Sequence, residues 1–295
     1  MTKNQPVDSL EAAATEIELA LLAPRAAGGP RSAVKYLSQH GRTQMHALIG
    51  QLPSSERENA RAEAERLLGS GVRALMCDAP RFPAGLRSFA GSPPALFYRG
   101  LLDCLDQYSI GLSGSRNASE EGLRAARACG EEVASLSGVL VSGYAKGVDT
   151  EGHLSALSAG AGTVAVLAEG IDQFKLRAEY RSVGEAIDRG FLVVSQFPPS
   201  QRWTAGAAMA RNQVVIGLSR ALVVVEARGS GGTVKAGQAA LRGGRPVFVL
   251  AGAGSVHDGN EQLLAAGAQP VADRAALAES LHRVRSDEAP QLPLL

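Results

Sequence analysis

The sequence predicts an α/β protein in which a doubly wound parallel sheet follows a small all-α domain. Three observations carry this prediction. Residues 7–68 consist of helical segments separated by glycine and proline. From residue 72 onward, short apolar runs alternate with amphipathic segments. The runs are almost wholly apolar, as strands must be when helices cover both faces of a sheet.

The helical region is expected to form a domain of its own over residues 1–68. Asp8 and Ser9 can cap its first helix, and Pro24 is expected to end it. Both SAM-like and helix-hairpin-helix bundles have this pattern, and the sequence does not choose between them. The expected helical segments are 7–24, 31–41, 43–52 and 54–71.

Residues 71–275 are expected to form the domain that contains the sheet. It begins with two strand-like runs, 72–78 and 95–100, joined by a proline-containing stretch that favours an extended connection. Phe97 and Tyr98 form the one dense aromatic cluster, and we expect them to pack against a sheet edge.

The segment from Ser109 to His153 has the pattern strand, loop, helix, strand, loop, helix. Its strands, 109–113 and 139–142, each end in a turn rich in glycine and serine. The spacing suits parallel strands, because a parallel return needs a crossover of a dozen or more residues. Both loops should therefore open on one sheet edge, where helix N-termini offer backbone N–H groups to anions. A pocket for a phosphorylated ligand is the first functional hypothesis.

The alternation continues toward the C-terminus, and residues 276–295 are expected to form a tail. Further strands are predicted at 163–170, 191–199, 221–227 and 246–252, and helices at 175–190, 207–219, 233–244 and 273–285.

Composition narrows the class of protein. The net charge is +1, so a polyanionic partner would have to meet locally clustered basic side chains. The three cysteines lack metal-type spacing and are expected to be reduced thiols of a cytoplasmic protein. No run is long enough to span a bilayer, and the N-terminus lacks the form of a signal peptide. The five histidines are dispersed, so we expect neither a metal nor a cofactor.

The loop after the first parallel strand has small residues at Gly114 and Ser115, followed by Arg116. Small side chains let backbone amides approach an anion, and an arginine adds a bidentate donor. Asn117 or Ser119 could cap the next helix. The spacing departs from the dinucleotide-binding G-x-G-x-x-G, and the second strand does not end in an acidic residue, so an NAD site is disfavoured.

The loop after the second parallel strand places Gly143 and Lys146 before a helix that carries Asp149 and His153. Lys146 can supply a positive charge, and Asp149 can cap the helix. An Asp and His pair without a nucleophile in register is poor evidence for catalysis, so a structural role for both is the alternative that we favour.

A third candidate wall comes from residues 202–245. Arg211 and Asn212 stand early in an otherwise apolar helix, Glu226 lies at the end of a strand, and Thr233 can cap the following helix. Basic residues outnumber acidic ones here and can supply a footprint for a polyanion, unless they lie on different faces. They are Arg202, Arg211, Arg220, Arg228, Lys235, Arg242 and Arg245, against Glu226 alone.

Six motifs occur in one order along the chain: GSR at 114–116, SGYAKGVDTEGH at 142–153, RNQVVIGLSRALVVVEA at 211–227, GSGGT at 229–233, GRPVFVLAG at 244–252 and GNEQLLAAGA at 259–268. Together they resemble the DNA-processing protein A family, DprA or Smf. The resemblance implies an extended Rossmann-like fold that binds and protects single-stranded DNA without being an enzyme. It further implies a homodimer that assists loading of the RecA recombinase in natural transformation or recombination.

The resemblance also assigns residue roles. Arg116 matches the arginine of the GSR motif, Lys146 a normally basic position, and Arg211 the arginine of an RN pair, and we assign phosphate contacts to these three. The other residues expected to shape the DNA- or phosphate-binding pocket are Gly114, Ser115, Gly143, Asn212, Ser230 and Gly231. The residues expected to hold the loops in place are Asp149, His153 and Glu226.

The chain departs from the family pattern at several points. Tyr144 stands where the family usually has an apolar residue, and it either stacks a base or is a bulky loop residue. The segment QFKLRAEY replaces a Tyr-Pro pair, and Ala251 and Gly252 replace a Pro-Gly pair. The C-terminal winged-helix domain of many members is expected to be missing.

The alternative function is a nucleotide-binding or nucleotide-cleaving protein of the lysine decarboxylase-like, or LOG, group. The PGGxGT loop of that group is similar to GSGGT here, so Glu226 and residues 229–233 would surround a ribose phosphate. The glutamate that follows the GT in those enzymes is absent. A nucleotide-sensing module of a stress or defence system is a third alternative.

Overall fold

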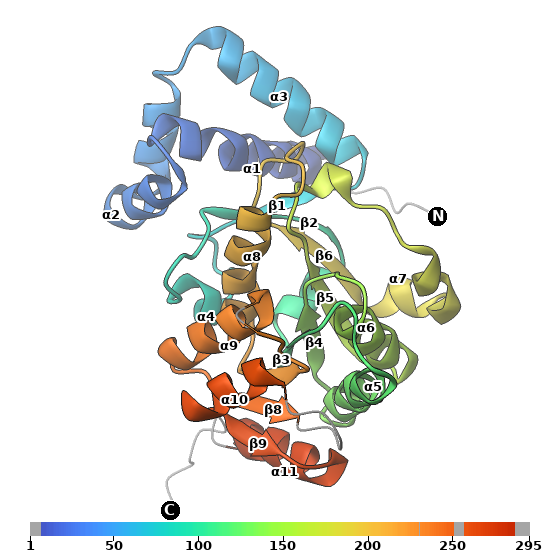
Figure 1. Ribbon diagram of the computed structural model, residues 1–295. Helices are drawn as coiled ribbons and strands as arrows, with labels where there is room; N and C mark the ends of the chain where they lie inside the picture. The colour runs from blue at the N-terminus through green and yellow to red at the C-terminus, as the bar shows by residue number, and fades with distance from the viewer. Residues whose placement is uncertain (1–6, 230, 251–256, 287–295) are drawn as a thin grey trace, which may run out of the picture.

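The computed structural model describes residues 7–229, 231–250 and 257–286, and in these ranges nine strands form one sheet (Figure 1). Their order across the sheet is β1-β2-β6-β5-β4-β3-β7-β8-β9. The strands are β1 (Arg73–Met76), β2 (Ala95–Gly100), β3 (Ser109–Gly114), β4 (Val139–Ser142), β5 (Gly162–Val166), β6 (Phe191–Ser195), β7 (Ala221–Val225), β8 (Val247–Leu250) and β9 (Gln269–Val271).

The sheet is parallel from β6 to β9, while β1 and β2 extend it in the antiparallel sense. From β3 the chain adds β4, β5 and β6 on one side and then returns to add β7, β8 and β9 on the other. The boundary between β3 and β7 is therefore a topological switch point. In open α/β sheets ligands bind in the crevice at such a point. The predicted doubly wound α/β fold is therefore confirmed.

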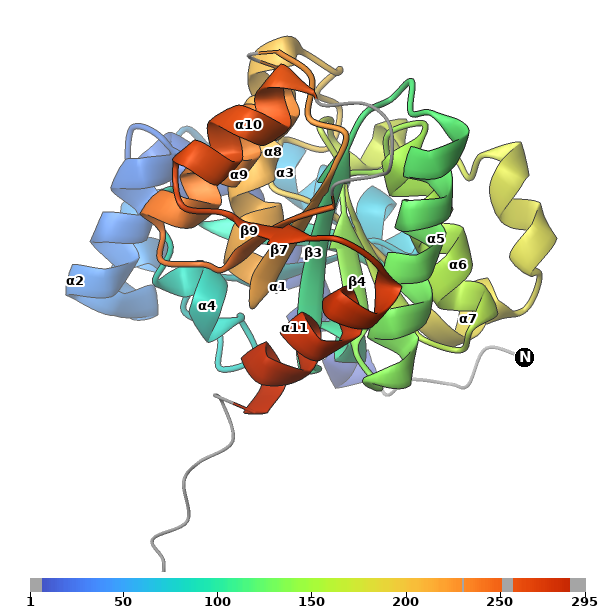
Figure 2. The same ribbon diagram turned by 60° about the horizontal axis from the view of Figure 1, so that its bottom comes forward.

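Helices cover both faces of the sheet (Figure 2). The helices are α1 (Val7–Ala26), α2 (Pro30–Ile49), α3 (Ser54–Gly69), α4 (Ala84–Arg87), α5 (Glu120–Ser135), α6 (Val148–Ser158), α7 (Ala186–Gly190), α8 (Ala205–Leu218), α9 (Gly232–Arg242), α10 (Asp258–Ala265) and α11 (Arg274–Ser286). On one face of the sheet, α5 and α6 pack on the central strands and α11 packs on α5. On the other face, α8 and α9 pack on the central strands.

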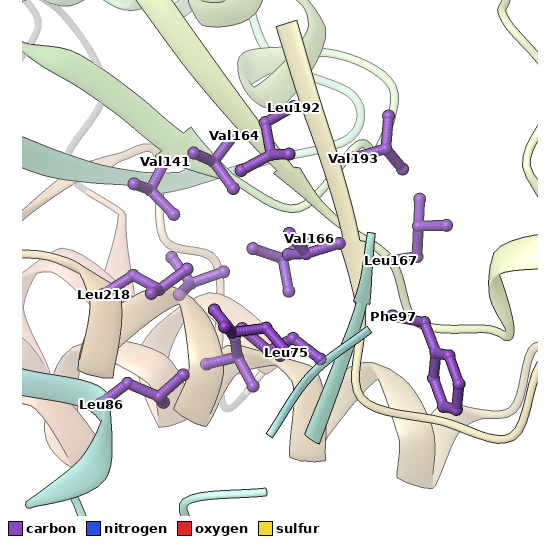
Figure 3. Close-up of a cluster of buried hydrophobic side chains, with 14 of the residues drawn as sticks. Leu75, Leu86, Phe97, Val141, Val164, Val166, Leu167, Leu192, Val193 and Leu218 are labelled. Atoms are coloured by element: carbon purple, nitrogen blue, oxygen red, sulfur yellow. The ribbon is translucent and has the colours of Figure 1, made fainter. Parts of the chain in front are cut away.

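Strand periodicity explains why there are two cores. Along β7, Leu222 and Val224 face the core under α8 and α9, while Val223 and Val225 face the core under α5 and α6. Successive side chains of a strand point to opposite faces, so an unbroken apolar run fills both cores. Figure 3 shows part of the first core, to which Leu192 of β6 and Leu218 of α8 both contribute.

The N-terminal helices pack on the antiparallel end of the sheet. Ile17 and Leu22 of α1 are buried in the same core as Leu75 of β1. The guanidinium of Arg42 in α2 donates hydrogen bonds both to Glu16 of α1 and to Asp78, which follows β1. A continuous core thus joins residues on both sides of the predicted boundary, and the domain division at residues 68–71 stays a prediction.

Several predicted element boundaries are wrong. The first helix continues through Pro24 to Ala26, since a proline in the last turn costs a single backbone bond. The predicted break after residue 41 is present, because α2 consists of two helices joined at a kink with Gly41 at φ 74°, but the second of them ends at Ile49 and not at residue 52. The helix predicted over 273–285 is confirmed as α11, which packs on α5 and buries Leu277 and Leu281, while residues 287–295 of the expected tail lie outside the described residues.

The predicted helix over 175–190 is also wrong. It is replaced by a 3-10 segment (Ala178–Val183) and the short helix α7, which are separated by Gly184 at φ 50°. A positive φ at this glycine interrupts the helix. The extended connection between β1 and β2 contains the short helix α4, while α10 and β9 arise where no element was predicted. Phe97 is buried beside β6, which confirms the packing prediction for this residue.

The shared core predicts that α1 contributes to the stability of the sheet. Ile17→Ala should lower the free energy of unfolding by about 2–5 kcal/mol, because it removes buried methyl groups and leaves a cavity. Leu10→Ala, on the exposed part of the same helix, is the matched control and should change it by less than about 0.5 kcal/mol. Urea unfolding followed by circular dichroism measures both, and equal effects of the two substitutions would contradict the shared core.

Candidate functional site

Two adjoining cavities lie over the carboxyl ends of the parallel strands. The first, of about 560 Å³, is bounded by the ends of β3 and β7 and by the first turns of α8 and α9. The second, of about 410 Å³, lies over the ends of β4 and β5. We call the two together the groove. Its shared wall consists of Arg116, Asn117, Ala145, Trp203 and Arg211.

The loop after β3 is held by backbone contacts that leave its arginine exposed. The Ser115 N–H donates to the carbonyl of Val225 at 3.2 Å, which ties the loop to the end of β7. Ser119 caps α5, accepting from the N–H of Gly122 at 3.0 Å, as one of the two predicted candidates. Arg116 stands between these anchors with its side chain exposed in both cavities.

Glu226, which follows β7, contacts the loop after β3 through hydrogen bonds. Its carboxylate oxygens each accept from the Ser119 N–H at 3.1 Å, and they also accept from the Ser119 hydroxyl and from Arg228. Burial acts to raise the pKa of Glu226, but these hydrogen bonds outweigh it and hold the pKa below its ordinary value. The residue has φ 51°, an unusual conformation outside glycine. Glu226 thus binds the loop at the start of α5, and its role in holding the loops in place stays a prediction.

The loop after β4 folds onto the loop after β3 through Gly147. This residue has φ 76°, and a Cβ there would lie 2.5 Å from the carbonyl oxygen of Ser115. The Asp149 carboxylate accepts from the N–H of Ala145 at 3.1 Å. Asp149 thus closes the loop that precedes α6 and is not the N-cap of that helix, which is Gly147. Lys146 is exposed at the tip of the loop, beside the second cavity.

Arg211 is a nearly buried cation in the groove, with 9% of its side chain exposed. Its Nη1 lies 4.0 Å from Oδ2 of Asp149, and its Nε has no hydrogen-bond partner among the described residues. Burial lowers the pKa of Arg211, which the charge of Asp149 partly offsets. The guanidinium lies directly against Gly143, where a Cβ would come within 1.3 Å of Nη1. The absence of a side chain at this position therefore leaves the room that the Arg211 guanidinium occupies.

His153 and Tyr144 belong to the core beneath the groove. The Nδ1 atom of His153 contacts the Thr163 hydroxyl, and the ring is fully buried. Tyr144 is 7% exposed, its ring centroid lies 5.1 Å from that of Tyr180, and the guanidinium of Arg177 lies 4.4 Å from the Tyr144 centroid. In this structure, Tyr144 is the bulky loop residue of the two alternatives, because its ring faces the core.

The third wall brings the predicted residues of α8 and α9 to the first cavity. Asn212 donates to the carbonyl of Gly232 at 3.4 Å, and Gly231 and Gly114 also line this cavity. Thr233 is not the cap of α9, which is Gly231; its hydroxyl donates to the Gly114 carbonyl at 3.2 Å. Ser230 lies outside the described residues.

The basic residues of 202–245 divide between the two ends of the sheet. Arg211, Arg228 and Lys235 line the first cavity. Arg220 immediately precedes β7, and Arg245 closely precedes β8, so both lie at the amino ends of the strands. The local excess of positive charge is therefore real but smaller than the count along the sequence suggests.

Sequence reasoning missed two residues that the structure places in the groove. Trp203, half-exposed in the shared wall, lies in the loop between β6 and α8. Arg177 reaches the second cavity from the segment that was mispredicted as helix. The sequence offered one signal for the place of Trp203 in the groove. Trp203 is the single tryptophan of the chain, and it stands eight residues before Arg211.

Within the described ranges, no group of three or more His, Cys, Asp or Glu side chains is placed to hold a metal ion. Among the same residues, no helix combines the length and the apolar character that crossing a membrane requires.

A family model described as DNA recombination-mediator protein A matches residues 73–282, which include the sheet and every described wall of the groove. The chain belongs to this family. Among curated members of the DprA/Smf family, it is 34% identical to DNA processing protein DprA of Streptococcus pneumoniae over 64% of this chain and 67% of that protein. It is 32% identical to Protein Smf of Escherichia coli, over 60% of this chain and 48% of the relative. The match thus spans about half the length of the Escherichia coli protein.

Two solved structures of DNA processing protein A share the fold. The protein from Streptococcus pneumoniae superposes with a TM-score of 0.67 at 24% identity, covering 95% of this chain and 98% of that one. The protein from Helicobacter pylori superposes with a TM-score of 0.62 at 24% identity, covering 72% and 96%. Its structure is described as giving insights into a single-stranded DNA binding mode of that protein.

The contact between Gly143 and Arg211 predicts the effect of adding one methyl group. Gly143→Ala should displace the guanidinium and lower the free energy of unfolding by about 1–3 kcal/mol, the usual cost of overpacking. Gly206→Ala is the matched control, because the nearest atom that its Cβ would meet is 4.0 Å away. Thermal unfolding of the two variants compares them directly, and an unperturbed Gly143→Ala protein would contradict the contact.

Burial of His153 predicts a pH dependence of stability. Burial and the charges of Arg211 and Arg177 lower the pKa of His153 to about 3, against about 6.5 in the unfolded chain. Between these values the unfolded state binds a proton that the folded state does not. The free energy of unfolding should therefore fall as pH drops below about 6.5, by up to about 1.4 kcal/mol per pH unit. His153→Asn should remove this part of the slope in urea unfolding series, whereas parallel slopes would show that His153 titrates normally.

Proposed function

We propose that this chain binds single-stranded DNA along the groove as a non-enzymatic binding protein. One observation carries the proposal: most of the exposed charges of the groove are basic, while two of its three lining carboxylates, Asp149 and Glu226, are buried and only Glu169 is partly exposed. Arg116, Lys146 and Lys235 are exposed. Asp149 and Glu226 are buried and accept hydrogen bonds from the loops. A phosphate backbone entering the groove therefore meets positive charge and free donors first.

Residue roles follow from position. Arg116 and Arg211 lie in the wall shared by the two cavities and are proposed to hold one phosphate between them, with Lys146 holding a neighbouring one. Gly114, Ser115, Gly143, Asn212 and Gly231 shape the surrounding surface. This arrangement resembles a track for a chain of phosphates more than a pocket for one nucleotide, because the two cavities adjoin along a single wall.

Membership of the family supports a role in recombination. The family is that of a recombination-mediator protein, and a single-stranded DNA binding mode has been described for the Helicobacter pylori relative. We propose that this chain acts in the cytoplasm as a homodimer, protects single strands, and assists loading of the RecA recombinase in transformation or recombination. Stimulation of RecA filament formation on protein-coated single strands would support this role.

The observed geometry favours binding over nucleotide cleavage. A hydrolase of the LOG type would need Glu226 as a working acid or base. Both oxygens of Glu226 already accept from Ser119, and its pKa is held below the ordinary value. Release of a free base from nucleoside monophosphates would support the enzymatic alternative and contradict our proposal.

The proposal predicts that affinity for single-stranded DNA falls strongly with salt concentration and that each arginine in contact with a phosphate contributes to this dependence. Arg116→Ala should weaken binding of an oligodeoxythymidylate about ten-fold, because a charge-assisted phosphate contact is lost. It should also reduce the slope of log K against log salt by about 0.7, the value for one phosphate of a single strand. Fluorescence anisotropy at several salt concentrations measures both quantities.

Arg189→Ala is the matched control. Arg189 is an exposed arginine, 72% accessible, which stands just before β6 at the amino ends of the strands. It should leave affinity and slope unchanged. If Arg189→Ala weakened binding as much as Arg116→Ala, the DNA would follow another surface and the groove assignment would fail.

A further inference from the structure

Trp203 is unusual among the large apolar side chains because it is exposed inside a basic groove. Its exposed fraction is 49%, and it lines both cavities. Met209, 46% exposed, lines the first cavity from the second turn of α8. Two of the five exposed large apolar side chains among the described residues thus line the groove. Exposed apolar surface at one functional site indicates contact with a ligand.

The backbone on either side of Trp203 is anchored. Gln201 accepts from the N–H of Gly170 at 2.8 Å, which ties the loop to the segment after β5. Thr204 caps α8 by accepting from the N–H of Ala207 at 3.0 Å. Anchors two residues before and one residue after Trp203 hold its backbone while the indole projects from it. A rigid aromatic side chain loses little conformational entropy on binding a flat partner.

The guanidinium of Arg116 lies over the indole of Trp203. The Arg116 Cζ lies 5.8 Å from the ring centroid, within the range of a cation–π interaction. A base inserted between the two planes would need about 7 Å, twice the contact distance of about 3.5 Å. Arg116 is exposed, so its guanidinium can move away from the indole by the difference between these two distances. Its charge then stays over the base or an adjacent phosphate.

We propose that Trp203 is a stacking platform for one unpaired base and that it gives the groove its preference for single strands over duplex. This inference rests on the proposed function. Phosphates are present in single strands and in duplexes alike, so arginine and lysine contacts alone discriminate poorly between them. The π-face of a base is available only when the base is unpaired and unstacked. An indole in the groove therefore distinguishes single strands from duplexes without depending on the base sequence.

The chain suits a direct test, because Trp203 is its single tryptophan and intrinsic indole fluorescence reports on this residue alone. The probes are an oligodeoxythymidylate of about 16 nucleotides, an abasic deoxyribose-phosphate oligomer of equal length, and a duplex of equal length. The oligodeoxythymidylate should quench the fluorescence at saturation, and the abasic oligomer should leave it nearly unchanged.

Three substitutions separate stacking from bulk. Trp203→Ala and Trp203→Leu should each weaken binding of the oligodeoxythymidylate about ten-fold, since stacking contributes about 1–3 kcal/mol per base. Both should leave binding of the abasic oligomer and of the duplex unchanged, so the preference for single strands falls by the same factor. Trp203→Phe should keep most of the affinity, because it keeps an aromatic face. Unchanged thermal unfolding midpoints confirm that the variants are folded.

Three outcomes would overturn the inference. If Trp203→Ala bound the oligodeoxythymidylate as tightly as the unaltered protein, with the same salt slope, the stacking role would fail while DNA binding by the groove would stand. If Trp203→Ala weakened the abasic oligomer equally, Trp203 would act on the backbone or on loop structure. Failure of the unaltered protein to bind any single strand would overturn the proposed function, and the stacking role with it.

Discussion

The contact between Arg211 and Gly143 is the constraint on which the rest of the groove depends. Arg211 comes from α8 on one face of the sheet, while Gly143 follows β4 and leads into α6 on the other face. The guanidinium passes over the sheet edge only because Gly143 has no side chain. The two faces of the doubly wound sheet are thus joined at the point where the cavities meet.

That contact has an energetic cost. Arg211 is a nearly buried cation whose nearest carboxylate, Asp149, lies 4.0 Å away, and its Nε has no partner within the described part of the chain. Burying a charge with incomplete pairing destabilises the folded state. An arriving phosphate would place a negative charge beside the guanidinium, so the same feature that costs stability in the unliganded protein favours binding. The nearly neutral chain can therefore present a positive groove, because Asp149 and Glu226 are used to brace loops.

Much of the fold could be predicted from the sequence, because β3, β4 and β7 are apolar runs bounded by turns. The position of Arg116, Lys146 and Arg211 at the carboxyl edge of the sheet could also be predicted, because each stands close to the end of a predicted strand or helix. Trp203 could not be predicted, since its place depends on how the loop before α8 crosses the sheet. Arg177 was missed for a related reason: its segment is held by tertiary contacts with Tyr144 rather than by helix periodicity.

The central claim is that a single strand lies along the carboxyl edge of the sheet, over the wall formed by Arg116, Trp203 and Arg211. Photo-crosslinking of the complete chain to an oligonucleotide that carries 4-thiothymidine, followed by mass spectrometry of the linked peptides, tests it most directly. We expect crosslinks in the loops after β3 and β4 and in the segment that contains Trp203 and Met209. Crosslinks concentrated on α1 to α3, or at the amino ends of the strands near Arg189 and Arg220, would contradict it.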